Sequence, residues 1–190
     1  QSDVILYDRA GYGESESDDS KRSVQNLTKD LEAVISALSQ NRKVILVGHS
    51  LGGMIIRDYA IKYPEKITAL VFVDSSHEAY NRPTQEQENM LVDTFSDSFG
   101  ETSGAAAEAK ELIENSVYMD TLPHLPDVPG VAITSMKTEA NHDEADRAKW
   151  YNSKELLKEG VRDFQHLTTT QRGHYIMLEE PDLVIAQEIK

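Results

Sequence analysis

The chain has 190 residues, a length that fits one domain with a sizeable core, and its 39% hydrophobic content is typical of folded globular proteins. A formal net charge of −14 with no compensating basic cluster argues against nucleic acid and anionic membrane surfaces as partners. Because the chain has no cysteine and no long apolar run, it offers no disulfide, zinc-thiolate site, thiol nucleophile or membrane-spanning helix.

The beginning of the chain predicts a strand, a turn and a helix. A short apolar run at residues 4–7 ends in the glycine-containing stretch 8–13, a pattern that predicts a strand followed by a turn. Ser23 is a favourable N-cap residue, and apolar side chains then recur at spacings of three and four along residues 24–38. We therefore expect a helix over 24–38 with one apolar face packed on a sheet.

The next segments alternate between strand and helix patterns. Continuous apolar runs at residues 44–47 and 67–73 are typical of strands that are covered on both faces. Between them, residues 51–63 carry helical spacing until Pro64 ends it. This alternation predicts an α/β fold with a parallel sheet and right-handed crossovers.

Residues 78–126 follow a different pattern, which is acidic and helical around 90–99 and 105–118. A helical insertion of this size after a strand predicts a lid, and a helical crossover packed on the sheet is the alternative. Its apolar side chains are expected either to line a pocket or to belong to an ordinary core. They are Met90, Leu91, Phe95, Phe99, Leu112, Ile113 and Tyr118.

The last third of the chain returns to the alternation of strands and helices. Residues 131–136 predict a strand, and residues 141–158 predict a helical region. A weaker, polar strand is expected at 167–170. Pro181 stands at the first position of a final helix, where proline is favoured.

The predicted strand 44–47 runs directly into the pattern G-x-S-x-G, formed by Gly48, His49, Ser50, Leu51 and Gly52. In a strained turn from strand to helix, flanking glycines leave room for the backbone and the serine hydroxyl is pushed out of the sheet. The start of the helix favours negative charge, and the Leu51 amide can donate to an oxyanion. Although glycine-rich turns often only connect elements, this setting predicts a nucleophile at Ser50.

Three segments in this order resemble the α/β-hydrolase superfamily. Residues 8–15, Asp-Arg-Ala-Gly-Tyr-Gly-Glu-Ser, resemble its DRxGxGxS turn, and residues 48–53 resemble its nucleophile elbow. Gly-His-Tyr at 173–175, followed by Glu-Pro-Asp at 180–182, resembles the segment that supplies its catalytic histidine. The resemblance covers nearly the whole chain and implies a mostly parallel sheet flanked by helices, with a helical lid.

The resemblance also divides the chain. We expect residues 1–77 and 127–190 to be the N-terminal and C-terminal parts of a hydrolase core, and residues 78–126 to be the lid or cap. In the family, a strand with an HG-type oxyanion turn precedes the DRxGxGxS strand, and this chain contains neither. Since the chain also begins at Gln1 within a few residues of a strand pattern, we expect a C-terminal fragment whose missing N-terminal segment supplies the second oxyanion donor.

A serine nucleophile needs a base, and among six histidines His174 has the best position. It follows the last predicted strand in a glycine-containing loop, and catalytic groups gather in such loops. His49 is expected to pack or hydrogen-bond locally within the elbow. The others are expected to be surface or structural histidines, and no second histidine accompanies His142 at a metal-ligand spacing. They are His77, His124, His142 and His166.

The acid that orients His174 is less clearly marked. The resemblance implies an acid after the strand 131–136, where the chain lacks the Gly-x-x-Asp of many relatives. Some members instead use an acid after the strand that follows the elbow helix, and Asp74 occupies that place. We expect Asp74 to be this acid, with Glu139 and then Asp143 as alternatives. If Asp74 is not the acid, a cap of a turn or helix is its structural role.

The resemblance implies a serine hydrolase that cleaves an ester, thioester or lactone bond of a small molecule through an acyl-enzyme, without metal or organic cofactor. Acyl transfer, carbon-carbon bond hydrolysis and an inactive ligand-binding protein on the same fold are the alternatives. We expect a cytoplasmic protein, with secretion as the alternative location. The oligomeric state is left open.

Overall fold

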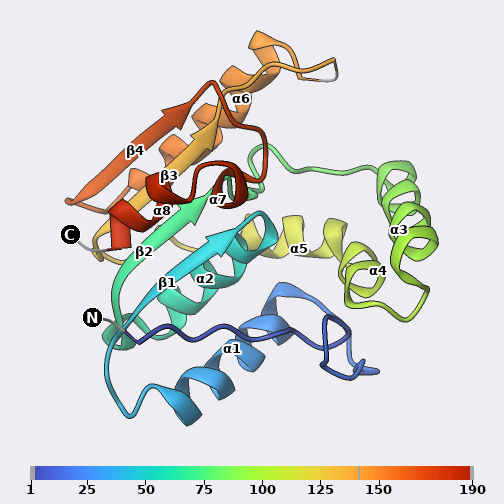
Figure 1. Cartoon of the computed structure of the whole chain (residues 1–190), viewed down its shortest axis with the longest axis horizontal. Helices are drawn as coiled ribbons and strands as arrows, with labels where there is room; N and C mark the ends of the chain where they lie inside the picture. The colour runs from blue at the N-terminus through green and yellow to red at the C-terminus, as the bar shows by residue number, and fades with distance from the viewer. Residues whose placement is uncertain (1–2, 141, 189–190) are drawn as a thin grey trace. The chain divides into compact units, whose positions relative to one another are not determined.

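The structure is a computed structural model that describes residues 3–140 and 142–188. The chain forms two compact units, one made of residues 1–41 and 82–120 and the other of residues 42–81 and 121–190. Figure 1 shows the elements of both units. Across the described residues, no helix combines the length and the apolar character needed to cross a membrane.

The unit formed by residues 42–81 and 121–190 is built on a parallel sheet of four strands in the order β1-β2-β3-β4 (Figure 1). The sequence prediction of an α/β fold with a parallel sheet is therefore confirmed. The strands are β1 (Val44–His49), β2 (Ile67–Val73), β3 (Gly130–Ser135) and β4 (Phe164–Thr169).

Helices cover both faces of this sheet. In Figure 1, α7 and α8 lie on one face, and α2 and α6 lie on the other. The predicted stop at Pro64 is confirmed, because a short 3-10 helix replaces the α-helix there. The helices of this unit are α2 (Leu51–Lys62), η1 (Pro64–Lys66), α6 (Glu144–Glu155), η2 (Leu156–Lys158), α7 (Ile176–Glu179) and α8 (Pro181–Glu188). The helical region was expected from 141, but Asn141 lies outside the described residues.

One hydrophobic cluster of this unit lies between the sheet and the two C-terminal helices. Its fully buried members come from β2, β3, α7 and α8, and they are Val71, Val73, Ile133, Ile176 and Val184. The prediction of a strand covered on both faces holds for the end of β2 and is wrong for β1. Ile45 and Val47 are 42% and 44% exposed, because β1 is an edge strand and only its alternate side chains face the core.

The other unit contains α1 (Val24–Leu38), α3 (Gln85–Phe99), α4 (Gly104–Ala109) and α5 (Leu112–Met119). The predicted helix over 24–38 is confirmed, and its residues at positions 24, 27, 31 and 35 are buried. The predicted helix over 105–118 is in fact two helices. The predicted strand at 4–7 is wrong, because an apolar run becomes a strand only where a neighbouring strand accepts its hydrogen bonds.

Contacts within this unit tie the N-terminal turn to α4. Arg9 donates two hydrogen bonds to Glu108, at 2.6 and 2.8 Å, and the Tyr12 hydroxyl donates a third at 2.8 Å. Gly11 has φ +79°, and a Cβ there would lie 2.4 Å from the Gly104 nitrogen. The helical segment 82–120 is thus packed with the first part of the chain, and its role as a lid remains a prediction.

The turn between β1 and α2 brings backbone segments unusually close together. Ser50 has φ 52° and ψ −122°, a strained conformation for a residue with a side chain. A Cβ on Gly48 would lie 2.5 Å from the Gly52 carbonyl oxygen, and one on Gly53 would lie 2.2 Å from the Ser75 Cβ. A Cβ on Gly52 would meet nothing within 4 Å. The tight positions are therefore Gly48 and Gly53, and the expectation that Gly52 also leaves room for the backbone is wrong.

Gly48 and Gly52 form a matched pair for mutation. We expect Gly48→Ala to lower the free energy of unfolding by about 2 kcal/mol or more, since the new methyl group overlaps backbone atoms that cannot move aside. Gly52→Ala places its methyl group in open space in the first turn of α2, where alanine is favoured over glycine by about 1 kcal/mol. Urea unfolding followed by circular dichroism measures both. Equal losses in the two variants would contradict the steric account.

Candidate active site

Ser50 lies on the strained turn, held from both sides by the backbone of β2 and the loop after it. Its amide donates to the Val73 carbonyl at 3.3 Å, and its carbonyl accepts from the Ser76 amide at 2.8 Å. Its side chain does not cap α2, although Leu51 is the first residue of that helix. Ser50 is half-buried, and it stands at the start of α2, where the first N–H groups of a helix have no partner within the helix.

His174 lies in the loop between β4 and α7, and two contacts hold that loop. The Ser135 hydroxyl donates to the Arg172 carbonyl at 2.6 Å, and the His49 ring is bonded through Nε2 to the His174 carbonyl at 2.9 Å. Because a carbonyl only accepts, His49 must carry its proton on Nε2. The His49 ring also packs 4.4 Å from the His174 ring, so the contacts of His49 join the elbow to the loop of His174 and are not confined to the elbow.

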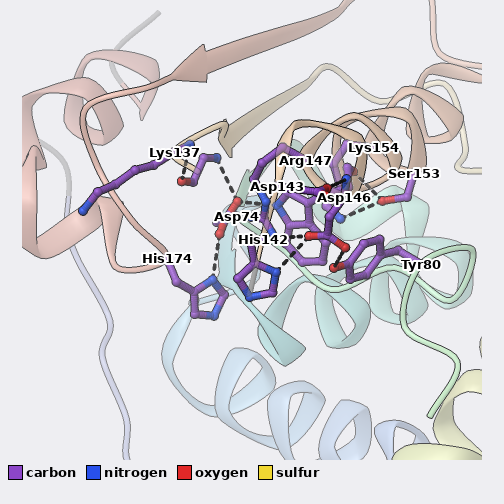
Figure 2. A network of polar contacts seen from close by, with 12 residues as sticks. Asp74, Tyr80, Lys137, His142, Asp143, Asp146, Arg147, Ser153, Lys154 and His174 are labelled. Atoms are coloured by element: carbon purple, nitrogen blue, oxygen red, sulfur yellow. Dashed lines mark hydrogen bonds and ion pairs between the residues drawn. The ribbon is translucent and has the colours of Figure 1, made fainter. Parts of the chain in front are cut away.

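Asp74 directly follows β2 and contacts His174 through its side chain (Figure 2). Its Oδ2 lies 2.7 Å from His174 Nδ1, while its Oδ1 accepts from the Ser135 amide at 2.9 Å and from Trp150 Nε1 at 2.7 Å. The side chain of Asp74 is 2% exposed and that of His174 is 41% exposed. A turn cap would bond to nearby backbone, whereas Asp74 bonds to three residues far from it in sequence.

This pattern of hydrogen bonds defines the form of His174. The Asp74 carboxylate accepts the proton on Nδ1, which leaves the lone pair of Nε2 free to take a proton from another group. Among the hydrogen bonds of the described residues, none joins Ser50 to His174. The structure therefore brings His174 and Asp74 into direct contact and places Ser50 on a turn bonded to the same end of β2.

The alternative acids lie elsewhere. Glu139 pairs with His142 through the backbone and places its half-exposed carboxylate 3.6 Å from Lys137 Nζ. Asp143 is the N-cap of α6, since its carboxylate accepts from the Asp146 amide at 2.8 Å. Neither side chain has a described contact with His174, so the geometry favours Asp74.

The remaining histidines all have close polar partners, as expected for surface or structural positions. His142 Nδ1 lies 2.8 Å from Asp146, which also accepts from the Tyr80 hydroxyl at 2.7 Å (Figure 2). The other three histidines also have polar partners. His77 lies beside Arg57 and Glu78, His124 lies beside Glu159, and His166 lies beside Thr134 and Glu155.

Two residues next to Asp74 have no counterpart among the sequence expectations. Trp150 and Lys154 lie one turn apart on α6, and both are buried. Lys154 Nζ lies 3.2 Å from the centre of the Trp150 ring and donates to the Ser153 hydroxyl at 2.9 Å. Burial lowers the pKa of Lys154 to about 7, against the attraction of Asp74. The sequence held one signal for these two residues, because the only tryptophan of the chain stands four residues before a lysine in a polar helix.

The seven apolar residues that the sequence singled out in the helical segment are not fully buried. Of the seven that were expected to line a pocket or to be ordinary core, three are exposed and four are half-buried. The exposed ones are Met90, Leu91 and Phe99. None of the seven residues therefore occupies an ordinary core position, and their role in lining a pocket remains a prediction.

Comparisons with known proteins agree with this fold. Salicylic acid-binding protein 2 of Nicotiana tabacum is 42% identical over 85 residues, which cover 39% of this chain and 32% of that protein. An esterase from Thermogutta terrifontis has the same fold with a TM-score of 0.68 at 17% identity, over 93% of this chain and 74% of that one. The monoacylglycerol lipase of Paleococcus ferrophilus gives 0.64 at 18% identity, over 95% and 80%.

The match to the tobacco protein spans about a third of that protein's length. The two solved structures, each below 25% identity, show the fold alone. The family described as alpha/beta hydrolase fold matches residues 1–188, which is nearly the whole chain. With the parallel sheet, the strained turn at Ser50 and the paired Asp74 and His174 already described, this match shows that the chain belongs to the α/β-hydrolase fold family.

Proposed function

We propose that this protein is a serine hydrolase that cleaves an ester-like bond of a small molecule, an ester, thioester or lactone, through an acyl-enzyme. The observation that carries the proposal is the 2.7 Å contact between Asp74 Oδ2 and His174 Nδ1, at the end of β2 to which the turn of Ser50 is bonded. A histidine fixed in this form by a buried carboxylate is suited to act as a base, and a serine on a strained turn is suited to act as a nucleophile.

In the proposed mechanism, the Ser50 hydroxyl attacks the substrate carbonyl while His174 Nε2 takes its proton. The Leu51 amide donates to the oxyanion that forms, and Asp74 stabilises the imidazolium. His174 then protonates the leaving group, which departs and leaves an acyl-enzyme on Ser50. Water, deprotonated by His174, hydrolyses the acyl-enzyme and restores the serine. A hydrogen bond between serine and histidine in such sites often forms only with substrate in place.

The names of the relatives are compatible with this proposal. An esterase and a lipase are among the solved structures with this fold, and both act on ester bonds. Acyl transfer and carbon-carbon bond hydrolysis use the same groups, and an inactive binding protein can retain the fold. The experiments therefore separate turnover from binding.

The first experiment follows hydrolysis of a short-chain p-nitrophenyl ester by the full-length protein and four variants. We expect Ser50→Ala and Asp74→Asn each to lower kcat by about 10³-fold or more, because one removes the nucleophile and the other leaves His174 without its proton acceptor. Glu139→Gln and Asp143→Asn are the matched controls and are expected to retain activity within a few-fold. Loss in Glu139→Gln with retention in Asp74→Asn would reassign the acid.

A second experiment addresses the binding alternative. A fluorophosphonate probe reacts with activated serines whatever the natural substrate is. We expect it to label the wild-type protein and to leave Ser50→Ala unlabelled. No labelling of the folded wild-type protein would reject the hydrolase proposal in favour of a ligand-binding protein.

A further inference from the structure

The side of Asp74 that does not contact His174 is closed by a tryptophan and a lysine. Trp150 Nε1 donates to Asp74 Oδ1, so the two carboxylate oxygens serve different partners. Lys154, one turn further along α6, is fully buried and places its Nζ over the face of the same indole ring. Lysine, tryptophan, aspartate and histidine thus form one continuous series of contacts that ends at the exposed imidazole of His174.

We propose that Trp150 and Lys154 are positioning residues for the paired Asp74 and His174. The indole N–H fixes the rotation of the Asp74 carboxylate, and the ammonium group over the ring reduces the negative charge that His174 experiences. This charge effect is a property of the folded chain. Its meaning for catalysis rests on the proposed function.

The burial of Lys154 is costly, and no ion pair among the described residues compensates it. An ammonium group can form three hydrogen bonds, and among the described residues that of Lys154 has Ser153 as its hydrogen-bond partner and the indole face as its second contact. A cation over an indole ring is attracted by the ring's electrons, most strongly where water is excluded. A lysine that served only packing would be replaced at lower cost by methionine.

The charged groups around Lys154 and His174 determine in which direction Lys154 shifts the pKa of His174. Burial is the largest influence on the pKa of Lys154 and lowers it, as Arg147 does, whereas Asp74 and Glu78 raise it, and the net value is about 7. Glu78 is itself paired with Arg57 at 2.7 Å.

His174 faces Asp74 and the ring of His49, whose own pKa is lowered by burial and by His174. A charged Lys154 favours the neutral form of His174, so the removal of that charge should raise the pKa of His174.

The test measures the His174 pKa directly by NMR of the full chain with ¹⁵N-labelled histidine, the signals being assigned with His174→Gln. We expect Lys154→Met to raise the pKa of His174 by about 0.5 or more. Lys149→Met, an exposed position on the same helix, is the matched control and should leave it unchanged. An unchanged or lowered pKa in a folded Lys154→Met protein overturns the proposal.

A second measurement does not depend on whether a Lys154 variant folds. Trp150 is the only tryptophan of the chain, so its fluorescence reports the charge over its ring. We expect the emission of the wild-type chain to change with a midpoint near pH 7, and the same change to persist in His174→Gln. A flat emission between pH 5.5 and 8.5, or a change that disappears in His174→Gln, overturns the proposal.

The stability of the chain should show the same titration. Because the pKa of Lys154 falls from 10.5 to about 7 on folding, the unfolded chain binds more protons between these pH values. The cost of burying the charge is therefore complete below pH 7 and disappears as the pH rises toward 10.5. We expect Lys154→Met to be stabilised relative to wild type most at pH 6 and least at pH 10, measured by urea unfolding. A pH-independent difference would contradict a titrating buried lysine.

None of these three measurements uses turnover or the probe for activated serines. If fluorophosphonate labelling fails while the His174 pKa and the Trp150 emission respond as expected, the proposed function is wrong and the charge coupling remains. If labelling succeeds and the pKa does not respond, only the coupling is wrong. In an active protein, the coupling also moves the low-pH limb of kcat/KM to higher pH in Lys154→Met.

Discussion

A buried carboxylate at the end of β2 is the interaction on which the rest of the site depends. Taking Asp74 out of water is costly unless donors replace the lost hydration, and the structure supplies three of them. They come from the end of β3, from α6 and from the loop after β4. Each donor brings its own segment to the same place, so the compensation of one buried group also fixes the positions of Ser135, Trp150 and His174.

The parallel sheet makes this convergence possible. In a parallel sheet the carboxyl ends of all strands lie at one edge, where loops far apart in sequence meet. Here the turn of Ser50 follows β1, Asp74 follows β2, Ser135 ends β3 and His174 follows β4. Four segments separated by up to 124 positions along the chain therefore contribute neighbouring groups. The order β1-β2-β3-β4 places the segment of Asp74 between those of Ser50 and Ser135.

Two of the four non-glycine residues that have a positive φ in the described part of the chain lie at the same edge. Ser50 and Asp74 both have positive φ angles, 52° and 39°, a conformation that is costly for residues with side chains. Backbone hydrogen bonds hold both, since Ser50 donates to the Val73 carbonyl and Asp74 donates to the Ile133 carbonyl at 2.7 Å. The proposed nucleophile and the proposed acid thus both stand on strained backbone, and the packed sheet beneath them provides the stability that opposes this strain.

Local patterns in the sequence were sufficient for the features that depend on neighbours along the chain. The period of the apolar residues predicted the helix over 24–38 and the alternation of strands and helices, and the G-x-S-x-G pattern predicted the turn at Ser50. The placement of Asp74 after a strand made it a candidate, but Glu139 and Asp143 remained open. Only contacts across the sheet distinguished among them, because the distance to His174 depends on which strands are neighbours.

The sequence by itself therefore determined most of the helices and strands, since these follow from short-range spacing. Three of its motifs, through their resemblance to the α/β-hydrolases, indicated the family and the candidate residues Ser50 and His174. The tertiary structure alone decided the partner of His174, the exposure of one face of β1 and the absence of a strand at residues 4–7. It also decided the burial of Lys154 against Trp150. Each of these depends on segments distant in sequence, because burial and strand pairing are properties of the packed chain and not of its local pattern.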